Sequence, residues 1–444
     1  MEQKDSPGKW LAIAPEPDAH EIMVIIHEIA QALRHPPAAW IPWETDGAEP
    51  YRIARGASLA HGSSGISLFY AYLSQISNTG TPFADEADRF ISHACDALEI
   101  TPMQSGLYRG LSGIAWTVQH LQGLLYTEAL EDQEADPNEE IDRLMLNHRS
   151  DPENFDLWEG CIGVGVYALG RFPHPNSKKL LELVVEQLDR LAVRTANGIT
   201  WFTPPGSLPG RTKLIYPHGF YSLGVAHGIS GVISFLSRVH ALGILPDFTA
   251  KLLDGAISWL LAQRKKNKSP LIFPQFLLPP DNKPLITNTF GWCHGDLGLA
   301  AALVSAAGCT GEASWKTTAI EAAYTSIEYL NDLSRTNPLS DSSLCHGTTG
   351  LGHLFNRLYQ ATGVEPFKEE ARKWFRQTIK LRNPGSGIAG FSKFGLTEDG
   401  EMAELYDPGF IQGTAGIGLS LMAAVTNLEP QWDQVMLISA PGKN

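Results

Sequence analysis

Two Cys-His pairs stand at equivalent places in an internal repeat, and their residue types suit a metal ion. Cys293-His294 and Cys345-His346 each come directly before a glycine that opens a G-x-x-G sequence. Two thiolates and an imidazole are a donor set typical of Zn²⁺. We therefore predict that Cys293, Cys345 and His346 bind zinc, with His294 as the alternative to His346. Three protein ligands leave the fourth position open, as in a catalytic rather than a structural zinc site.

A third histidine and an aspartate are candidates for acid–base chemistry beside this metal. His227 also comes directly before a G-x-x-G glycine, so it should face the same place as the Cys-His pairs. Asp156 lies shortly before the third copy and is predicted to hydrogen-bond His227 and to set its tautomer and pKa. The remaining cysteines are interpreted as small buried hydrophobic residues: Cys95, Cys161 and Cys309.

These residues belong to a repeat that must position them. Seven G-x-x-G sequences between residues 62 and 416 form a series of long, fairly even spacing, with first glycines 48 to 68 residues apart. Such self-similarity defines a repeat architecture. The residue before the first glycine is polar in every copy: His61, Arg109, Glu159, His227, His294, His346 and Gln412. We interpret His61, Arg109 and Glu159 as supporting or capping groups around a common mouth.

Each G-x-x-G opens an apolar stretch with helical character, and amphipathic stretches lie between the copies. Each repeat is therefore predicted to run from an amphipathic helix through a connection and the glycine-rich turn to a more apolar helix. Residues 296–304 are almost all small or apolar, so a helix there must be buried on all sides. This favours an inner ring of helices covered by an outer ring. The predicted fold is all-α, an α/α toroid of seven helical hairpins. The amphipathic stretches are 19–35, 85–100, 139–148, 177–194, 249–263, 314–332 and 366–381.

The predicted organisation is one toroidal domain over residues 1–430 and a C-terminal tail over 431–444. Two intervals rich in proline and aromatic residues, 199–221 and 272–288, precede the fourth and fifth copies. We expect them to form loops or short strands that overhang the mouth of the ring, where binding residues often lie.

The amino-acid composition limits the partners that the protein is expected to bind and the compartment in which it is expected to occur. The formal net charge of −14 argues against nucleic acid, which requires a basic face, and is compatible with a cationic partner. Five cysteines are few for 444 residues, and the first residues lack the apolar segment of a secretory signal. No apolar run is long enough to cross a bilayer. We therefore expect a cytoplasmic protein that is not an integral membrane protein.

The ordered motifs resemble those of a known family. The chain is similar to the lanthionine synthetase C-like proteins, the cyclases of lanthipeptide (lantibiotic) biosynthesis. The segments that carry the resemblance are 226–231 (AHGISG), 291–295 (GWCHG), 344–350 (LCHGTTG) and 409–418 (GFIQGTAGIG). The resemblance implies an α/α toroid, zinc on Cys293, Cys345 and His346, an acid–base role for His227 and an assisting Asp156. Two positions differ from the pattern of many free-standing cyclases: His294 replaces a tyrosine, and Thr289 replaces an arginine.

The resemblance also implies a reaction. A zinc-bound cysteine of a dehydrated precursor peptide would add to dehydroalanine or dehydrobutyrine and form a lanthionine or methyllanthionine ring. A separate dehydratase would act first, and an exporter is a further expected partner. The alternatives are a relative that adds another thiol such as glutathione, a prenyltransferase-like zinc barrel, and a non-catalytic zinc scaffold that binds peptides.

Overall fold

The structure of the chain is a computed structural model. It describes residues 10–35, 50–77, 81–126, 136–147, 153–208, 210–265, 271–287, 289–336, 339–396 and 402–439.

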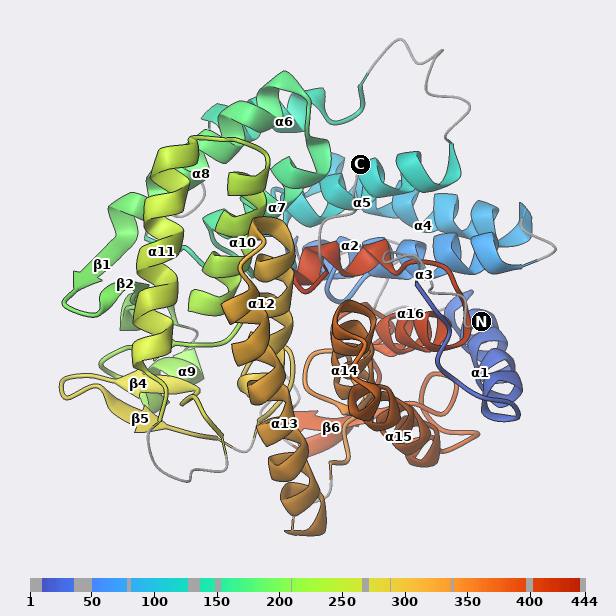
Figure 1. The fold of residues 1–444 in the computed structure, drawn as a ribbon. Coiled ribbons are helices and arrows are strands. Elements are labelled where there is room, and N and C mark those ends of the chain that lie inside the picture. The colour runs from blue at the N-terminus through green and yellow to red at the C-terminus, as the bar shows by residue number, and fades with distance from the viewer. Residues whose placement is uncertain are drawn as a thin grey trace, which may run out of the picture.

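Seven helices form a closed inner ring, each beginning at a G-x-x-G sequence. Each of these helices contacts the next in chain order, and the last contacts the first, so that they encircle a common centre (Figure 1). Their inward and outward faces are both buried, as expected for helices without a polar side. The inner helices are α3 (Ser63–Ile76), α5 (Leu111–Leu125), α7 (Cys161–Arg171), α10 (Ile229–Ala241), α12 (Asp296–Thr310), α14 (Thr348–Thr362) and α16 (Thr414–Val425).

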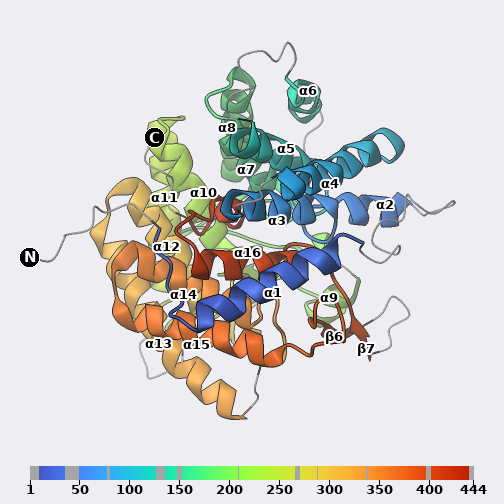
Figure 2. The ribbon, with the colours of Figure 1, turned by 90° about the vertical axis from the view of Figure 1, so that its right-hand side faces the viewer.

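The amphipathic stretches form an outer layer around this ring (Figures 1 and 2). The fold is therefore the predicted all-α double ring. The shorter α6 packs mainly against α8 rather than directly on α5, and α2 (Pro50–Ala57) packs against α3 and α4. The outer helices are α1 (Asp18–Leu33), α4 (Thr81–Ile100), α6 (Glu139–Asn147), α8 (Pro175–Leu191), α11 (Pro246–Ala262), α13 (Ala313–Thr336) and α15 (Glu365–Leu381).

The order within each hairpin differs from the sequence interpretation, which placed the amphipathic helix before the apolar one. In the structure α3, α7, α10, α12 and α14 each pack on the outer helix that follows, since the connection after the inner helix is short. The first amphipathic helix, α1, instead packs against the last inner helix, α16, and lies beside it in Figure 2. The two ends of the chain thus complete one hairpin between them.

The intervals 199–221 and 272–288 join in one small sheet. Strand β3 (Tyr221–Ser222) pairs with β4 (Phe276–Leu278), which pairs with β5 (Lys283–Leu285), all antiparallel. Two hairpins, β1 (Ala192–Thr195) with β2 (Gly198–Trp201) and β6 (Lys393–Leu396) with β7 (Met402–Leu405), are separate. The short helix α9 (Gly210–Ile215) and strands β6 and β7 lie toward the lower right in the view of Figure 2.

Among the described residues, backbone hydrogen bonds join neighbouring G-x-x-G turns, except for the fourth and fifth. In six of the seven turns they involve the residue two positions before the first glycine, and Leu157 and Trp292, three positions before it, donate two of them. The turns are packed so tightly that the second glycine has no room for a side chain. At Gly350 or Gly416, a Cβ would lie within 2.0 Å of the carbonyl oxygen six residues earlier. The bonds run from Ala60 N to Tyr108 O, Tyr108 N to Trp158 O, Leu157 N to Ala226 O, Trp292 N to Cys345 O, Cys345 N to Ile411 O and Ile411 N to Ala60 O.

The described part of the predicted C-terminal tail, residues 431–439, is buried inside the ring instead of trailing from it. Its 3₁₀ helix η5 (Gln431–Met436) and the residues that follow accept hydrogen bonds from several repeats. Donors include Tyr108 Oη to Val435 O, Trp292 Nε1 to Met436 O and Ser305 Oγ to Ser439 O. These contacts do not test the predicted domain boundary at residue 430, which stays a prediction. Residues 440–444 lie outside the described part of the chain.

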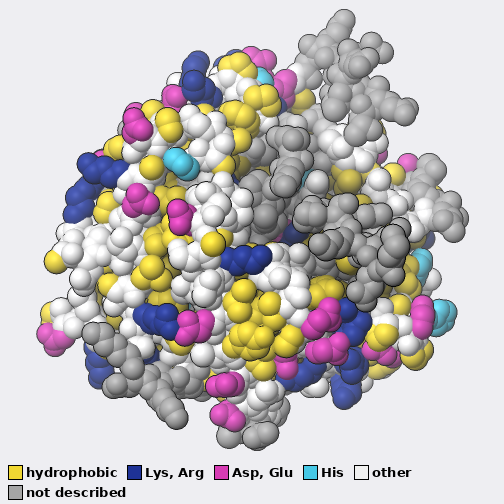
Figure 3. Space-filling view, in the orientation of Figure 1, with side chains coloured by type: hydrophobic (Ala, Val, Ile, Leu, Met, Phe, Trp, Pro, Cys, Tyr) yellow, Lys and Arg dark blue, Asp and Glu magenta, His cyan; other side chains and the backbone are white. Residues whose placement is uncertain are grey.

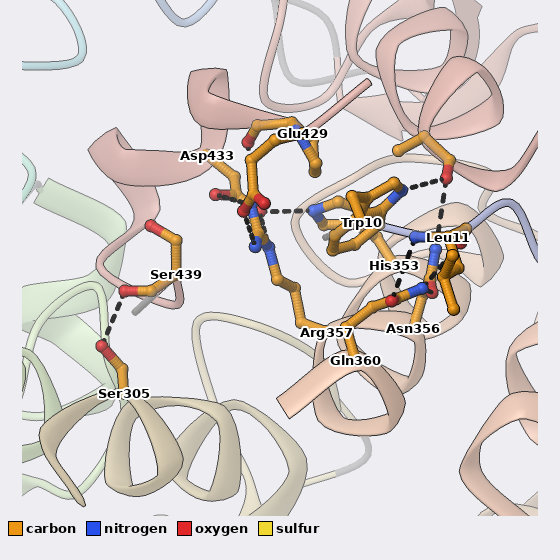
Figure 4. A network of polar contacts seen from close by, with 12 residues as sticks. Trp10, Leu11, Ser305, His353, Asn356, Arg357, Gln360, Glu429, Asp433 and Ser439 are labelled. Atoms are coloured by element: carbon orange, nitrogen blue, oxygen red, sulfur yellow. Dashed lines mark hydrogen bonds and ion pairs between the residues drawn. The ribbon is translucent and has the colours of Figure 1, made fainter. Parts of the chain in front are cut away.

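Asp433 is the centre of a buried ionic network on this segment (Figure 4). Its carboxylate accepts hydrogen bonds from His353 Nε2 at 2.7 Å and from Arg357 Nε at 2.6 Å. The same guanidinium lies 4.6 Å from the ring centroid of Trp10, and it donates to Glu429 Oε1 at 2.7 Å. The network joins α14 to both ends of the chain.

Charges are mixed on the outer surface. On the face shown in Figure 3, basic and acidic side chains are interspersed, with no continuous basic area. None of the helices in the described part of the chain combines the length and apolar character that a bilayer-spanning segment needs.

The Asp433 network yields a stability prediction. Asp433→Asn should lower the free energy of unfolding by about 3 kcal/mol, because it leaves the buried Arg357 cation without its main partner. Glu429→Gln is the matched control: it removes the other, 41% exposed carboxylate on Arg357 and should cost less than about 1 kcal/mol. Denaturant unfolding of both variants measures the difference, and equal losses would contradict the assignment.

Candidate metal centre and acid–base pair

The two Cys-His turns bring Cys293, Cys345 and His346 together. Cys293 lies in the turn before α12, and Cys345 and His346 lie in the turn before α14. One ligand atom from each residue lies within 4.8 Å of the others, and both thiols are buried. A hydrogen bond from Cys345 and the nearby imidazoles of His294 and His346 lower the pKa of Cys293 below its usual value, against the effect of burial.

Asp341 fixes the orientation of His346. Its Oδ2 lies 3.1 Å from Nε2 of the imidazole, which leaves Nδ1 as the nitrogen available to a metal. Burial by itself would lower the pKa of His346, but the hydrogen bonds with Asp341 and Cys293 raise it to about 10. Because a ligating imidazole must be neutral, metal binding here would release a proton.

These residues fit a zinc ion. Bonds of about 2.0–2.3 Å in a tetrahedral arrangement place ligand atoms roughly 3.5 Å apart, so the observed cluster needs only small side-chain adjustments. Soft sulfur donors, a nitrogen donor and a carboxylate that orients the imidazole are the usual environment of this ion. Within the described part of the chain, no fourth Cys, His, Asp or Glu joins the cluster.

His227 and Asp156 form a hydrogen-bonded pair. His227 Nδ1 lies 2.7 Å from Asp156 Oδ2, while Asp156 Oδ1 accepts from the backbone nitrogens of Glu159 and Gly160 at 2.8 and 2.9 Å. Burial would lower the pKa of His227, but the hydrogen bond and the charge of Asp156 raise it above its usual value. The pair therefore favours the protonated form of the imidazole.

The repeat explains how Asp156 reaches His227. Four residues before the first glycine, the second, fourth, fifth and seventh copies have a glycine that packs against the following turn. Gly224, for example, has space for no Cβ, because that atom would lie 1.9 Å from Cys293 O. The third copy has Asp156 at this position, so its carboxylate meets His227 of the following turn.

His294 lies beside the cluster but outside it. Its ring centroid is 4.8 Å from that of Phe276 on β4 and 6.4 Å from that of His227. Its buried Nδ1 has no hydrogen-bond partner among the described residues. Burial lowers the pKa of His294, with His227 and His346 adding to the effect against Cys293. The imidazole of His294 is therefore neutral and lies near both His227 and His346. Thr289 lies exposed on the preceding loop.

The other residues that precede the first glycines have separate surroundings. His61 is buried and its Nδ1 lies 2.8 Å from Asp407 Oδ2, whereas Gln412 accepts from Lys393 Nζ at 2.6 Å. Arg109 is exposed, and its guanidinium carbon lies 5.8 Å from the ring centroid of Trp158. The half-buried Glu159 neighbours Asp156, and burial raises its pKa to about 7, with Arg109 opposing and Asp156 adding to the shift.

Sequence reasoning missed the contribution of Asp341. A comparison of copies could have identified it, because Asp341 and Asp407 both lie six residues before a first glycine, and each pairs with a histidine. Phe276 was also missed as a neighbour of His294, since it comes from a strand whose pairing the repeat pattern does not define.

The Asp156–His227 contact gives a pH prediction. Asp156→Asn should lower the pKa of His227 to or below its usual value, because burial remains while the negative charge is lost. The imidazole would then lose its proton at a lower pH than in the wild type. NMR titration of the His227 ring protons measures the shift, with Asp254→Asn on the exposed face of α11 as the control. An unchanged titration midpoint would refute the coupling.

Comparisons with known proteins show the family and the fold of the chain. The family model described as lanthionine synthetase C-like protein matches residues 54–437. The nisin biosynthesis protein NisC of Lactococcus lactis subsp. lactis is 23% identical over 356 residues, which cover 74% of this chain and 81% of that protein. A solved structure of nisin cyclase superposes with a TM-score of 0.66 at 19% identity, covering 96% of this chain and 98% of that chain. The chain belongs to the lanthionine synthetase C-like family.

Proposed function

We propose that this protein is a zinc-dependent lanthipeptide cyclase. Its substrate would be a dehydrated precursor peptide that contains dehydroalanine or dehydrobutyrine and free cysteines, and its product a peptide with lanthionine or methyllanthionine rings. The similarity to nisin cyclase and NisC supports the substrate class. The observation that carries the proposal is the buried Cys293–Cys345–His346 cluster, a three-donor set beside a histidine–aspartate pair.

The metal and the histidine would have different tasks. Zinc bound by the cluster would supply a coordination position in which a substrate cysteine is held as a thiolate. The protein's own part is to keep the reacting groups together and dry, which the burial of Cys293 and Cys345 favours. Asp341 would keep His346 in its ligating orientation.

His227 would transfer the proton that the addition requires. The substrate thiol loses its proton, its sulfur forms a bond to the β-carbon of the dehydro residue, and the α-carbon must then gain a proton. Because Asp156 accepts the Nδ1 proton of His227, the other ring nitrogen remains available to receive and return a proton. The overall addition is therefore balanced without an oxidant or a reductant.

His294 would complete the wall around the reacting alkene. Its Nδ1 is buried, but Nε2 also makes no hydrogen bond to the described residues, so Nε2 could donate a hydrogen bond to the substrate or accept one from it. Thr289, at the position where some relatives carry arginine, presents no cation. Neutral hydrogen bonds and His227 would thus have to stabilise the negative charge that develops on the substrate.

The remaining partners belong to the same proposal. The chain would act after a separate dehydratase and before an exporter, in the cytoplasm. The resemblance of the site to that of thiol-adding relatives leaves glutathione addition as an alternative chemistry. A diphosphate-binding barrel is disfavoured, because four carboxylates, Asp156, Glu159, Asp341 and Asp407, lie near the turns and would repel diphosphate.

Substitution of a zinc ligand tests the metal site. Cys345→Ser should reduce zinc from about one ion per chain to almost none and should abolish ring formation, because the donor set loses a thiolate. Cys309→Ser, a half-buried thiol near the end of α12, is the matched control and should retain both. Elemental analysis and mass spectrometry of thiol alkylation on a dehydrated cysteine-containing peptide measure the outcome. Wild-type zinc content in Cys345→Ser would refute the ligand assignment.

Cobalt substitution separates a catalytic site from a structural one. An open fourth position predicts that the visible spectrum of the Co²⁺ protein changes when a cysteine-containing peptide is added. A closed site of a non-catalytic scaffold predicts no change.

Substitution of His227 tests the acid–base role. His227→Ala should retain zinc but lower kcat by about 100-fold or more, since the proton donor to the α-carbon is lost. His120→Ala, remote from the cluster on α5, serves as the histidine control once its folding has been checked by circular dichroism. If His227→Ala cyclises the peptide at the wild-type rate, another group supplies the proton.

A further inference from the structure

Beside His227, two oppositely charged side chains have no polar partner. Arg109 and Glu159 both directly precede a first glycine, and they come from consecutive turns. Neither charged group makes a hydrogen bond or ion pair with the described residues; the contact of Arg109 is with the ring of Trp158. Every other residue at this position, apart from His294, has a polar partner: His61, His227, His346 and Gln412.

Trp158 links these two side chains to His227. Its ring centroid lies 5.8 Å from the Arg109 guanidinium carbon and 5.9 Å from the ring centroid of His227. The indole is held in place by Tyr108, a fully buried residue whose ring stacks on it at 4.6 Å. A fixed aromatic surface therefore extends from the acid–base pair to Arg109, with Glu159 following Trp158 in the chain.

The charges restrict what can bind there. An anion would be attracted by Arg109 but repelled by Asp156 and Glu159, and a cation would meet the opposite conflict. A peptide group satisfies both, because its carbonyl oxygen accepts from a guanidinium and its N–H donates to a carboxyl oxygen. The substrate class of the family is a peptide, and the order of the turns places this surface beyond His227 from the metal cluster.

We propose that Arg109 and Glu159 form a clamp for the peptide backbone next to the dehydro residue, with Trp158 as its floor. The inference rests on the proposed function, since it assigns a binding subsite to the same site. Arg109 donates to a backbone carbonyl, and Glu159 accepts from a backbone N–H of an extended segment. The clamp holds the alkene beside His227 while the cysteine occupies the metal cluster.

The test uses an uncharged peptide on the zinc-loaded protein. The probe is a short synthetic peptide, blocked at both ends, with one dehydroalanine, one cysteine and no charged side chains; a serine analogue of the cysteine measures binding without reaction. Arg109→Gln and Glu159→Gln should each weaken binding of the serine analogue by about tenfold in titration calorimetry, because a neutral amide replaces a group that can carry a charge and therefore forms a weaker hydrogen bond. KM for the cysteine peptide should rise, with a smaller change in kcat, and zinc content and thermal midpoint should stay at wild-type values.

Gln412→Ala, the same position in the seventh turn, is the matched control and should bind the analogue as the wild type does. Unchanged binding in both Arg109→Gln and Glu159→Gln, with cyclisation by the wild type, would overturn the clamp and leave the proposed function standing. Weakened binding in these variants, without cyclisation by the wild type, would support the clamp and overturn the cyclase assignment. An effect confined to peptides that carry an acidic or basic side chain would overturn backbone recognition.

Discussion

Close backbone packing between the G-x-x-G turns is the constraint on which the rest of the structure depends. In six of the seven turns, the residue two positions before the first glycine forms backbone hydrogen bonds with a neighbouring turn, and Cys345 is one of these residues. Its amide bonds to Ile411 and its carbonyl to Trp292, so the thiol is attached to backbone that both neighbouring turns hold. Metal ligands on ordinary surface loops would lack this support.

The chemistry arises from differences among nearly equivalent positions. One position before the glycine, the side chain is cationic, acidic, amide or imidazole, according to the copy. Four positions before the first glycine, several copies have a further glycine, which lets the turn pack closely against the next one. The third copy has Asp156 at this position, and its carboxylate hydrogen-bonds to His227 of the next turn. A repeated scaffold thereby positions an asymmetric site, because adjacent turns present different side chains at matching positions.

Much of this arrangement could be predicted from the sequence, because recurrence of the same turn implies equivalent places in space. The ring, the proximity of Cys293 to Cys345 and the Asp156–His227 contact all follow from that equivalence. The pairing of inner with outer helices could not be predicted in this way. In a closed ring a repeat can be taken to begin at either helix, so the sequence does not show which outer helix belongs to which inner one. The burial of Trp432 and its neighbours was missed because a short segment without periodicity shows no helical or strand pattern. Asp341 was missed because its partner lies within its own turn.

The meeting of the two chain ends on α16 has a consequence for synthesis. Trp10 Nε1 donates to Ala423 O across 413 residues of sequence, and Ile13 and Ala14 bond to the neighbouring Ala424. Contacts of such separation form late, because the whole intervening chain must be made and ordered first. Until the last repeat leaves the ribosome, Ile411 is absent and Cys345 lacks its backbone partner. A truncated chain would therefore present Cys293 and Cys345 without the completed ring, so that the proposed metal cluster would assemble only once the last repeat has been made.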